Sequence, residues 1–488
     1  MHQQPAGEPG PAPGPEHELH VVNPATEQPV ATVPGTTPGQ AGAAVRRAVR
    51  AQRRWAALPP ADRARLLRRF AAEVDARTEE LARLEVAEAG HTIGTARREA
   101  GNVRDLLEYA AGGAERLTGL QIPVPGGVDV TFAEPLGVVA VIVPWNFPMP
   151  IAAWGAAPAL AAGNAVLLKP AETTPLTALR LAGLALAAGL PEDLTALRLA
   201  GLALAAGLPE DLFQVLPGAG PVTGAALVGH PDVAKVVFTG SAATGRAVMA
   251  ACARRVKRLT LELGGKSPNI VFADADLERA AATAPASFLD NTGQDCCARS
   301  RILVQRPVYE RFLELLEPAV LAVRAGDPAD PATGMGPLIS AAQRERVRGY
   351  VPEDHPAAIR GTVPGGPGFW YPATVLEGHR APARAAVEEI FGPVAVVTPF
   401  EDEDEAVRLA NATEYGLSGS VWTRDVGRAL RVSRAVHAGN LSVNSHSSVR
   451  YWTPFGGFKQ SGLGRELGPD ALAAFTETKN VFISTEED

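Results

Sequence analysis

The stretch between Glu134 and Lys169 constrains the fold of this chain more than any other, because it contains no charged residue. Residues 137–143 form a continuous apolar run that is typical of a strand buried on both faces of a sheet. Residues 165–168 repeat this pattern after a helical segment at 152–162. Prolines interrupt the stretch, so it lacks the roughly 20 consecutive apolar residues of a membrane-spanning helix. It therefore predicts a strand, a helix and a second strand in the core of a large α/β protein.

Three further strand patterns follow at 213–216, 233–239 and 259–263. The second ends in a Gly-Ser turn at Gly240, which opens a helix. The N–H groups of such a turn, together with the helix N-terminus, are suited to bind phosphate. No Gly-Lys-Ser/Thr of a P-loop follows this turn, which argues against a nucleotide hydrolase. The series predicts an open sheet that binds a ligand at the carboxyl ends of its strands.

Composition argues against several classes of function. The 488 residues carry a formal net charge of -7, so the chain shows no basic footprint for nucleic acid or an anionic membrane. The length allows about three domains. Three cysteines cannot build a disulfide framework, and they predict a reducing compartment, the cytoplasm. Residues 1–18 are rich in Pro, Gly and acidic residues and predict a disordered tail, not a signal peptide.

Two of the three cysteines, Cys296 and Cys297, lie side by side after a Gly-Gln pair that is typical of a turn or a helix start. The amides of such a turn would lower the pKa of a thiol from about 8.5 and make its thiolate a strong nucleophile. The alternative is an inert cysteine of the core. A carboxylate, an asparagine and a nucleotide-type loop lie upstream in the sequence, and together they favour the nucleophile.

Glu262 and Asn146 are the candidates for the upstream carboxylate and asparagine. Glu262 lies in a strand between Leu261 and Leu263, so its carboxylate should point to the face opposite to theirs. An ordinary exposed strand residue is the alternative. Asn146 follows the strand at 137–143, where a ligand should bind, although asparagine is also a common turn residue.

Residues Leu176–Asp193 recur letter for letter as Leu194–Asp211. Two identical units do not make a solenoid, which needs at least about three. Each copy is typical of a nearly uncharged buried helix that ends at Gly-Leu-Pro, and a sheet of this kind has room for one. We therefore expect the extra copy to form an extruded helical hairpin with its turn at Gly189–Pro191.

Seven short motifs occur in one order along the chain: PWNFP, KPAE, FTGS, LELGGKSP, GQDC, EEIFGPV and PFGGFKQSGLGRE. In this order the chain resembles the aldehyde dehydrogenase superfamily from about Val21 to Ser484. The resemblance implies oxidation of a small-molecule aldehyde to the carboxylic acid, with NAD as cofactor and NADP also allowed. It also implies an α/β fold with a Rossmann-like NAD-binding domain, an α/β catalytic domain and a small β oligomerisation element.

The resemblance implies roles for individual residues. Cys296 is implied as the nucleophile, Asn146 as a donor to the oxyanion, and Glu262 as the base that activates the hydrolytic water. The presence of Glu262 argues against the CoA-acylating branch of the family. No metal is implied. The implied cofactor contacts are Val143, Pro144, Trp145, Lys169, Glu172, Gly220, Phe238, Gly240, Ser241, Thr244, Leu263, Glu389 and Phe391.

Among these contacts, Lys169 and Glu172 would bind the adenosine ribose, and Ser241 the pyrophosphate. Glu389 and Phe391 would lie on the nicotinamide side. A carboxylate at Glu172 binds ribose hydroxyls and repels a 2′-phosphate, so NAD is favoured over NADP.

The expected organisation places the NAD-binding domain at 19–118 and 143–262, including the duplicated helix at 176–211. The oligomerisation element is expected at 119–142 and 476–488, and the catalytic domain at 263–475. An open sheet edge in the oligomerisation element would favour a homodimer or homotetramer.

Two alternatives remain beside this function. One is a cysteine hydrolase or acyltransferase without cofactor, which usually needs a histidine partner such as His230 or His355. The other is a non-catalytic or impaired homologue, because of the repeat. The substrate stays open as well: the loop Val443–Trp452 suits aminoaldehydes, betaine aldehyde or aliphatic aldehydes.

Overall fold

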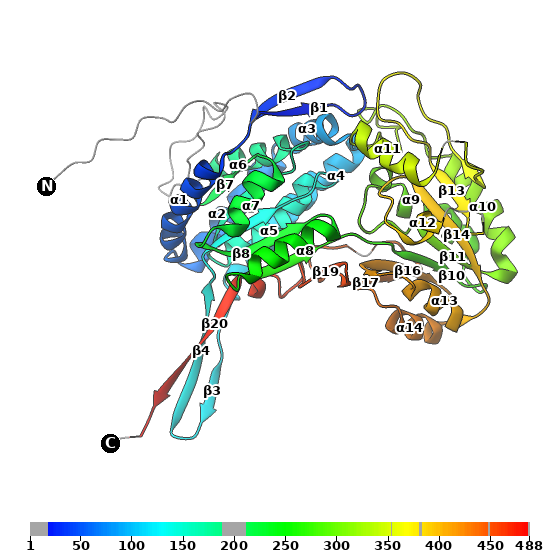
Figure 1. The fold of residues 1–488 in the computed structure, drawn as a ribbon. Helices are drawn as coiled ribbons and strands as arrows, with labels where there is room; N and C mark the ends of the chain where they lie inside the picture. Colours follow the sequence, from blue (N-terminus) through cyan, green and yellow to red (C-terminus); the bar gives the residue numbers. More distant parts are fainter. Residues whose placement is uncertain (1–17, 188–210, 353, 380–382, 448, 487–488) are drawn as a thin grey trace.

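The charge-free stretch forms the centre of a six-stranded sheet, in which β5 and β6 pair in parallel. The computed structural model describes residues 18–187, 211–352, 354–379, 383–447 and 449–486 (Figure 1). The strand order is β19-β9-β8-β5-β6-β7, parallel except where β19 joins β9. This confirms the predicted Rossmann-like arrangement. The strands are β5 (Val138–Ile142), β6 (Ala165–Lys169), β7 (Phe213–Val215), β8 (Val233–Thr239), β9 (Arg258–Glu262) and β19 (Gly462–Leu463).

Helices pack against this sheet because their apolar faces match its buried strands. In α5, a Cβ atom at Gly155 would lie 2.7 Å from the side chain of Val141 on β5, so glycine lets the helix approach the strand closely. On α1, Trp55 is fully buried and donates its indole N–H to the carbonyl of Leu160 at 2.8 Å. The helices of this body are α1 (Pro38–Ala56), α2 (Pro60–Asp75), α3 (Thr78–Ala89), α4 (Ile93–Ala114), α5 (Pro148–Ala161), α6 (Leu176–Ala187), α7 (Ala225–Gly229) and α8 (Ala242–Ala253).

A second body is built on a seven-stranded sheet in the order β12-β13-β14-β11-β10-β16-β17, parallel except between β12 and β13. The strands are β10 (Pro268–Val271), β11 (Arg301–Gln305), β12 (Ile359–Arg360), β13 (Thr374–Glu377), β14 (Val394–Phe400), β16 (Ser418–Trp422) and β17 (Asn440–Val443). Its helices are α9 (Leu277–Phe288), α10 (Tyr309–Leu321), α11 (Ala341–Tyr350), α12 (Ala383–Val387), α13 (Glu403–Asn411) and α14 (Val426–Ala435).

Ser461, the residue before β19, joins the two bodies by binding the segment that follows β9. Its hydroxyl donates to the carbonyl of Gly264 at 2.7 Å and accepts the amide of Gly416 at 2.9 Å. Its carbonyl accepts the amide of Leu263 at 2.9 Å. Two short pairs complete the elements near the joint and the N-terminal side: β15 (Tyr415–Gly416) with β18 (Phe458–Lys459), and β1 (Glu18–Val22) with β2 (Pro29–Pro34).

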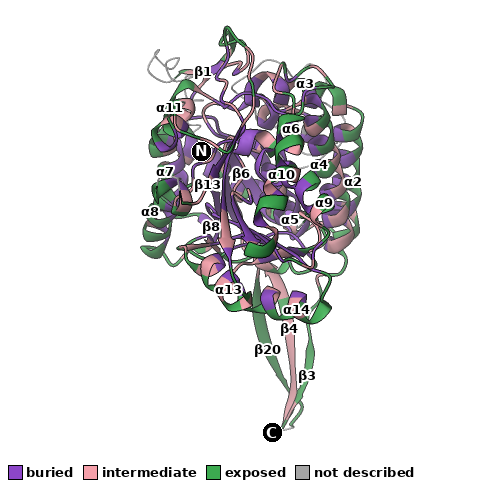
Figure 2. Ribbon diagram, turned by 90° about the vertical axis from the view of Figure 1, so that its right-hand side faces the viewer, coloured by how far each residue is buried: buried purple, intermediate pink, exposed green. Residues whose placement is uncertain are grey.

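The third sheet is an arm that projects from the two bodies (Figure 1). It consists of β3 (Gln121–Val124), β4 (Gly127–Pro135) and β20 (Thr476–Ser484) in the order β20-β4-β3. The strand β5 belongs to the six-stranded sheet, so by strand pairing the arm ends at Pro135, before the expected boundary at residue 142. Large apolar side chains are exposed along the arm, and Figure 2 shows its strands as exposed or intermediate.

The first copy of the repeat supplies α6, and most of the second copy lies outside the described residues, as does the expected turn at Gly189–Pro191. Glu88 anchors the start of α6 by accepting the amides of Leu176 and Thr177 at 2.6 and 2.8 Å. At the end of the second copy, Asp211 pairs with Arg47 at 2.9 Å. Because the copies are identical, deleting either one keeps all of these partners.

We expect deletion of residues 194–211 to raise the melting temperature and the soluble yield while activity is kept or raised. The reason is the expectation from the sequence that a second apolar helix without a place in the fold would expose a surface that promotes association. Thermal unfolding and NADH formation by the wild-type and shortened proteins measure the effect. A lower melting temperature or a loss of NAD binding would mean that the fold depends on the additional residues.

Candidate active site

The carboxyl ends of the parallel strands bring most of the predicted residues to one edge of the six-stranded sheet. Ile142, the last residue of β5, lies opposite Lys169 on β6 and Phe238 on β8. Thr239 lies opposite Glu262 on β9. The loop Val143–Asn146 therefore leaves the sheet between the Lys169 and Phe238 positions, as the strand pattern predicts.

Gln294 holds the loop that carries Cys296. Its fully buried side chain accepts the amide of Ile339 at 2.9 Å and donates to the carbonyl of Asn291 at 3.0 Å. Asn291 and Thr292 have φ values of 46° and 58°, so the chain turns through the left-handed region just before the cysteines. The Gly-Gln pair before the cysteines predicted a turn or a helix start, but nothing in the sequence indicated that the Gln294 side chain shapes the loop.

Asn146 is buried against this loop. Its side-chain N–H donates to the carbonyl of Gln294 at 2.9 Å, and its own carbonyl accepts the side-chain N–H of Asn291 at 2.7 Å. The amide of Asn146 and the Cys296 loop are thus joined although they lie far apart in the sequence. Its second side-chain N–H is the group that a developing oxyanion needs.

Cys296 is partly exposed, and the glycines after Glu262 lie against its backbone. A Cβ atom at Gly265 would lie 2.2 Å from the carbonyl oxygen of Cys296. The prediction that turn amides lower the pKa of this thiol is wrong. The neighbouring Cys297 thiol, burial and the carboxyl groups of Asp295 and Glu389 raise the pKa of Cys296 well above its usual value.

Glu262 is buried at the end of β9, so the alternative of an exposed strand residue is wrong. Among the described residues, neither of its carboxylate oxygens has a hydrogen-bond partner. Burial, Glu466 and Cys297 raise the pKa of Glu262 well above its usual value. A carboxyl group in this environment is suited to accept a proton near neutral pH.

Glu466 and Lys235 extend this buried group, and the sequence analysis assigned them no role. Burial raises the pKa of Glu466 to about 7 and lowers the pKa of Lys235 to about 8. The Lys235 ammonium donates to the carbonyl of Ala474 at 2.8 Å and lies 4.5 Å from the centre of the Phe475 ring. The Gly-rich motif ending in Glu466 was a signal, but its spacing alone does not show that Glu466 faces Glu262.

Lys169 and Glu172 form the outer part of the edge. The Lys169 ammonium is buried and lies 3.4 Å from Glu172, whose other carboxylate oxygen accepts the amide of Gly220 at 2.6 Å. The three residues therefore lie together, as the implied ribose contacts require. Burial lowers the pKa of Lys169, and Glu172 partly opposes that effect.

The turn after β8 is built for close approach of a ligand. Ser241 caps α8 and accepts the amide of Thr244 at 3.2 Å. A Cβ atom at Gly240 would lie 2.7 Å from the ring of Phe238, so a side chain there would collide with that ring. A Cβ atom at Gly245 would lie 2.5 Å from the side chain of Leu263. The Gly240 amide donates to the carbonyl of Glu262 at 3.0 Å, so the N–H groups suited to a phosphate are those at the start of α8.

The resemblance implies Glu389 and Phe391 as contacts on the nicotinamide side, and these two residues contact Gly265 and Trp145, respectively. Trp145 and Phe391 make an edge-to-face ring pair with centroids 5.2 Å apart, and Phe391 has a φ of 63°. Glu389 accepts the amide of Gly265 at 2.9 Å. Burial raises the pKa of Glu389 to about 7. Val143 and Pro144 lead from β5 into Trp145.

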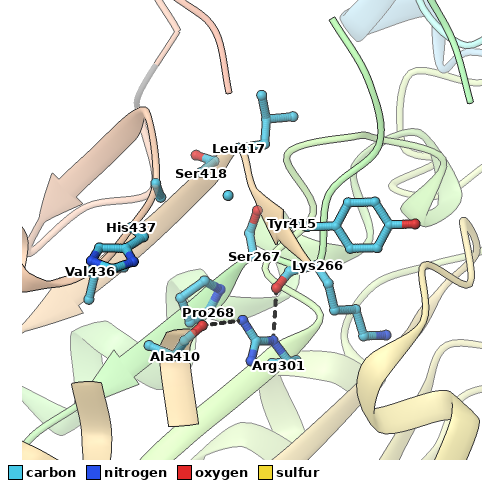
Figure 3. A pocket seen from close by; sticks show the side chains of 12 residues that line it. Lys266, Ser267, Pro268, Arg301, Ala410, Tyr415, Leu417, Ser418, Val436 and His437 are labelled. Atoms are coloured by element: carbon cyan, nitrogen blue, oxygen red, sulfur yellow. Dashed lines mark hydrogen bonds between the residues drawn. The ribbon is translucent and has the colours of Figure 1, made fainter. Parts of the chain in front are cut away.

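A cavity next to the Lys266 segment is too small for a substrate. Its volume is about 10 Å³, which is the space of one water molecule. Figure 3 shows Arg301 in this cavity with bonds to the carbonyl groups of Lys266 and Ala410, both at 2.8 Å. A third carbonyl, that of Leu409, accepts from Arg301 at 2.8 Å, so the guanidinium holds backbone segments together.

Comparison with known proteins decides the family. The model of the aldehyde dehydrogenase family matches residues 12–195 and 192–481. The chain belongs to the aldehyde dehydrogenase family. The two matched segments of this aldehyde dehydrogenase meet at the boundary between the two copies of the repeat, as expected for an insertion relative to the family.

Relatives of this aldehyde dehydrogenase cover nearly its whole length. Betaine aldehyde dehydrogenase from Mesorhizobium japonicum is 42% identical over 476 residues, which are 96% of this chain and 94% of that protein. The crystal structure of PnpE from Pseudomonas sp. WBC-3 has a TM-score of 0.89 and 37% identity, covering 96% of this chain and 95% of that one.

A betaine aldehyde dehydrogenase from Staphylococcus aureus, solved in complex with NAD+, has a TM-score of 0.89 and 34% identity over 96% of this chain and 92% of that one.

In the part of the chain that the structure describes, no helix is long and apolar enough to cross a membrane. Of the two histidines considered above, His230 lies before β8 and His355 after α11, so neither belongs to the Cys296 loop.

Proposed function

We propose that this chain oxidises an aldehyde to the carboxylic acid with NAD, through a covalent intermediate on Cys296. The observation that carries the proposal is the hydrogen bond of 2.9 Å between the Asn146 side chain and the carbonyl of Gln294, two residues before Cys296. It joins the proposed oxyanion donor to the loop of the proposed nucleophile. Relatives solved with NAD and the family membership support the same reaction.

In the proposed reaction Cys296 first gives its thiol proton to water. The thiolate then attacks the aldehyde carbon and forms a C–S bond while the C=O π electrons move onto the oxygen. The oxyanion of the resulting thiohemiacetal accepts N–H groups from the Asn146 side chain and from the Cys296 backbone. Removal of one such donor typically raises a barrier by about 2.7–4 kcal/mol. NAD+, when bound, accepts the hydride of the aldehyde carbon, which leaves a thioester on Cys296.

Glu262 then acts as the general base for hydrolysis. Its buried carboxylate takes a proton from water, and the oxygen of that water attacks the thioester carbon. The C–S bond breaks, the carboxylic acid leaves, and Cys296 is restored. Glu262 suits this role because its oxygens have no other partner among the described residues.

The residues at the sheet edge fit the cofactor. The N-terminus of α8 offers N–H groups to a pyrophosphate. The carboxylate of Glu172, fixed by the amide of Gly220 at 2.6 Å, offers an acceptor to ribose hydroxyls and repels a 2′-phosphate. NAD is therefore the proposed cofactor, with NADP used less well.

Betaine aldehyde or a related aminoaldehyde is the proposed substrate class, as the curated relatives suggest. Aromatic rings gather at the end of the loop Val443–Trp452. The ring of Tyr451 pairs with that of Tyr109 at 5.5 Å and with that of Trp452 at 4.5 Å between centroids. Aromatic faces attract quaternary ammonium groups. NADH formation with betaine aldehyde, 4-aminobutanal and butanal tests this proposal. A preference for butanal over both nitrogen-containing aldehydes would contradict it.

The arm supports a homodimer or homotetramer. It carries exposed apolar side chains on the outer strand β20, including Phe482 and Ile483, and its outer edges are open to a further strand. We expect light scattering at micromolar concentration to give a dimer or tetramer, and Phe482→Asp to shift the mass towards the monomer. A wild-type monomer would refute the assembly.

The state of the cysteines supports a reducing compartment such as the cytoplasm. Cys252, Cys296 and Cys297 are free thiols in the structure. The proposed chemistry needs Cys296 in this form, because a thiol in a disulfide is no nucleophile.

A further inference from the structure

The residue directly before the proposed nucleophile is an aspartate whose side chain turns back onto the two cysteines. Asp295 accepts the amide of Cys297 at 2.9 Å through its side chain and the amide of Ala298 at 3.0 Å through its backbone. A carboxylate oxygen of Asp295 and the sulfur atoms of Cys296 and Cys297 all lie within 4.8 Å of one another. The turn thus holds a carboxylate beside both thiols.

Arg299 supports the ionised form of this carboxylate. The buried Arg299 side chain donates to the carbonyl of Cys297 at 3.0 Å. Burial raises the pKa of Asp295, and the positive charge of Arg299 partly counteracts that rise. The amide of Cys297 has the same effect. The Asp295 side chain is therefore held by the Cys297 amide and attracted by the positive charge of Arg299 in the same loop.

The other charged groups around Cys296 act differently. Glu389 also faces Cys296, but its pKa of about 7 leaves it partly protonated at neutral pH. Glu262 interacts with Cys297 and not with Cys296 among the groups that shift these pKa values. The turn holds the Asp295 carboxylate within 4.8 Å of both sulfur atoms, so a negative charge on Asp295 opposes a negative charge on Cys296 directly.

We propose that the Asp295 carboxylate tunes the nucleophile: it disfavours the Cys296 thiolate in the free enzyme and so keeps the cysteine in its thiol form. The proposal rests on the proposed role of Cys296. Electrophiles and oxidants react with the thiolate and not with the thiol. Asp295 therefore protects a partly exposed cysteine from alkylation and oxidation while no substrate is bound.

The pH dependence of alkylation tests the proposal without any turnover. Cofactor-free wild type, Asp295→Asn and Asp295→Glu are treated with iodoacetamide at a series of pH values, and peptide mass spectrometry separates Cys296 from Cys297. Asparagine keeps the acceptor for the Cys297 amide but removes the charge, whereas glutamate keeps the charge. A like charge at this separation shifts a pKa by about one unit or more.

We expect Asp295→Asn to move the alkylation midpoint of Cys296 to lower pH and to speed alkylation at pH 7 about tenfold, corresponding to one pKa unit. Asp295→Glu should stay close to wild type. Asp402→Asn removes a charge at the start of α13, outside the contacts of Cys296, and likewise keeps its acceptor for a backbone amide, so it should leave the midpoint unchanged. Should Asp295→Asn fail to fold, Asp295→Ser offers another acceptor to the Cys297 amide.

Two results would overturn the proposal. Slower alkylation of Asp295→Asn would make Asp295 the base that removes the thiol proton, and an unchanged midpoint would leave it a structural cap. Both results are independent of the proposed function, because alkylation reports on the thiol whether or not NADH forms. Loss of the nucleophile assignment would appear separately, as NADH formation by a Cys296 variant.

Discussion

Cys296→Ala should abolish NADH formation, whereas Cys297→Ala should keep most of it. The Asn146 side chain binds the carbonyl of Gln294, two residues before Cys296. The Cys297 side chain, in contrast, is buried in the core. Loss of a nucleophile lowers turnover by a factor on the order of 10⁶ in a well-studied protease, so no measurable rate is expected here. The absorbance of NADH with saturating aldehyde measures both variants.

The matched variant Cys297→Ala controls for damage to the loop, because it changes the adjacent residue by the same atoms. Its melting temperature and NAD binding should be compared with those of Cys296→Ala. Equal loss of activity in the two variants, with both folded, would remove the assignment of Cys296 as the nucleophile.

Glu262→Gln should form the first equivalent of NADH rapidly and then turn over slowly. Acylation needs Cys296 and Asn146, whereas release of the acid needs the base. Glutamine keeps the size of the side chain, and removal of a buried unpaired carboxyl group should not destabilise the fold. General base catalysis contributes about 10²–10⁴-fold, so steady-state turnover should fall by that order.

Stopped-flow absorbance detects the burst of NADH, and mass spectrometry of the quenched enzyme detects the acyl group on Cys296. Wild type provides the reference amplitude. Loss of the burst together with turnover would place Glu262 in an earlier step, such as removal of the thiol proton.

Sequence patterns predicted the frame of the site well because that frame follows from parallel strands. Apolar runs identify buried strands, and parallel strands of one sheet present their carboxyl ends at the same edge. Asn146, Lys169 and Glu262 therefore had to lie near that edge once the strands were found. The contact between Asn146 and Gln294 needed more than that, because it joins two bodies of the molecule.

Burial and charge in the site could not be predicted from alternation. Glu262 follows a period-two pattern that predicts exposure, but the chain from Phe455 to Glu466 folds over the end of β9 and buries it: a Cβ atom at Gly456 would lie 2.9 Å from Glu262. The thiol pKa of Cys296 was predicted in the wrong direction for a similar reason. The largest causes of the raised pKa are the adjacent Cys297 thiol and burial, and burial cannot be read from the local sequence.

The pairing of β4 with β20 has a consequence for biosynthesis. Lys479 binds Glu134 at 2.9 Å and Asn480 binds Asp129 at 3.1 Å, across 345 and 351 residues of chain. In the body beside the arm, Asn164 donates to the carbonyl of Phe475 across 311 residues. Contacts at such separations form late and slow folding. A ribosome-bound chain that still lacks β20 therefore cannot complete the arm, and the arm can form only after translation has passed this strand.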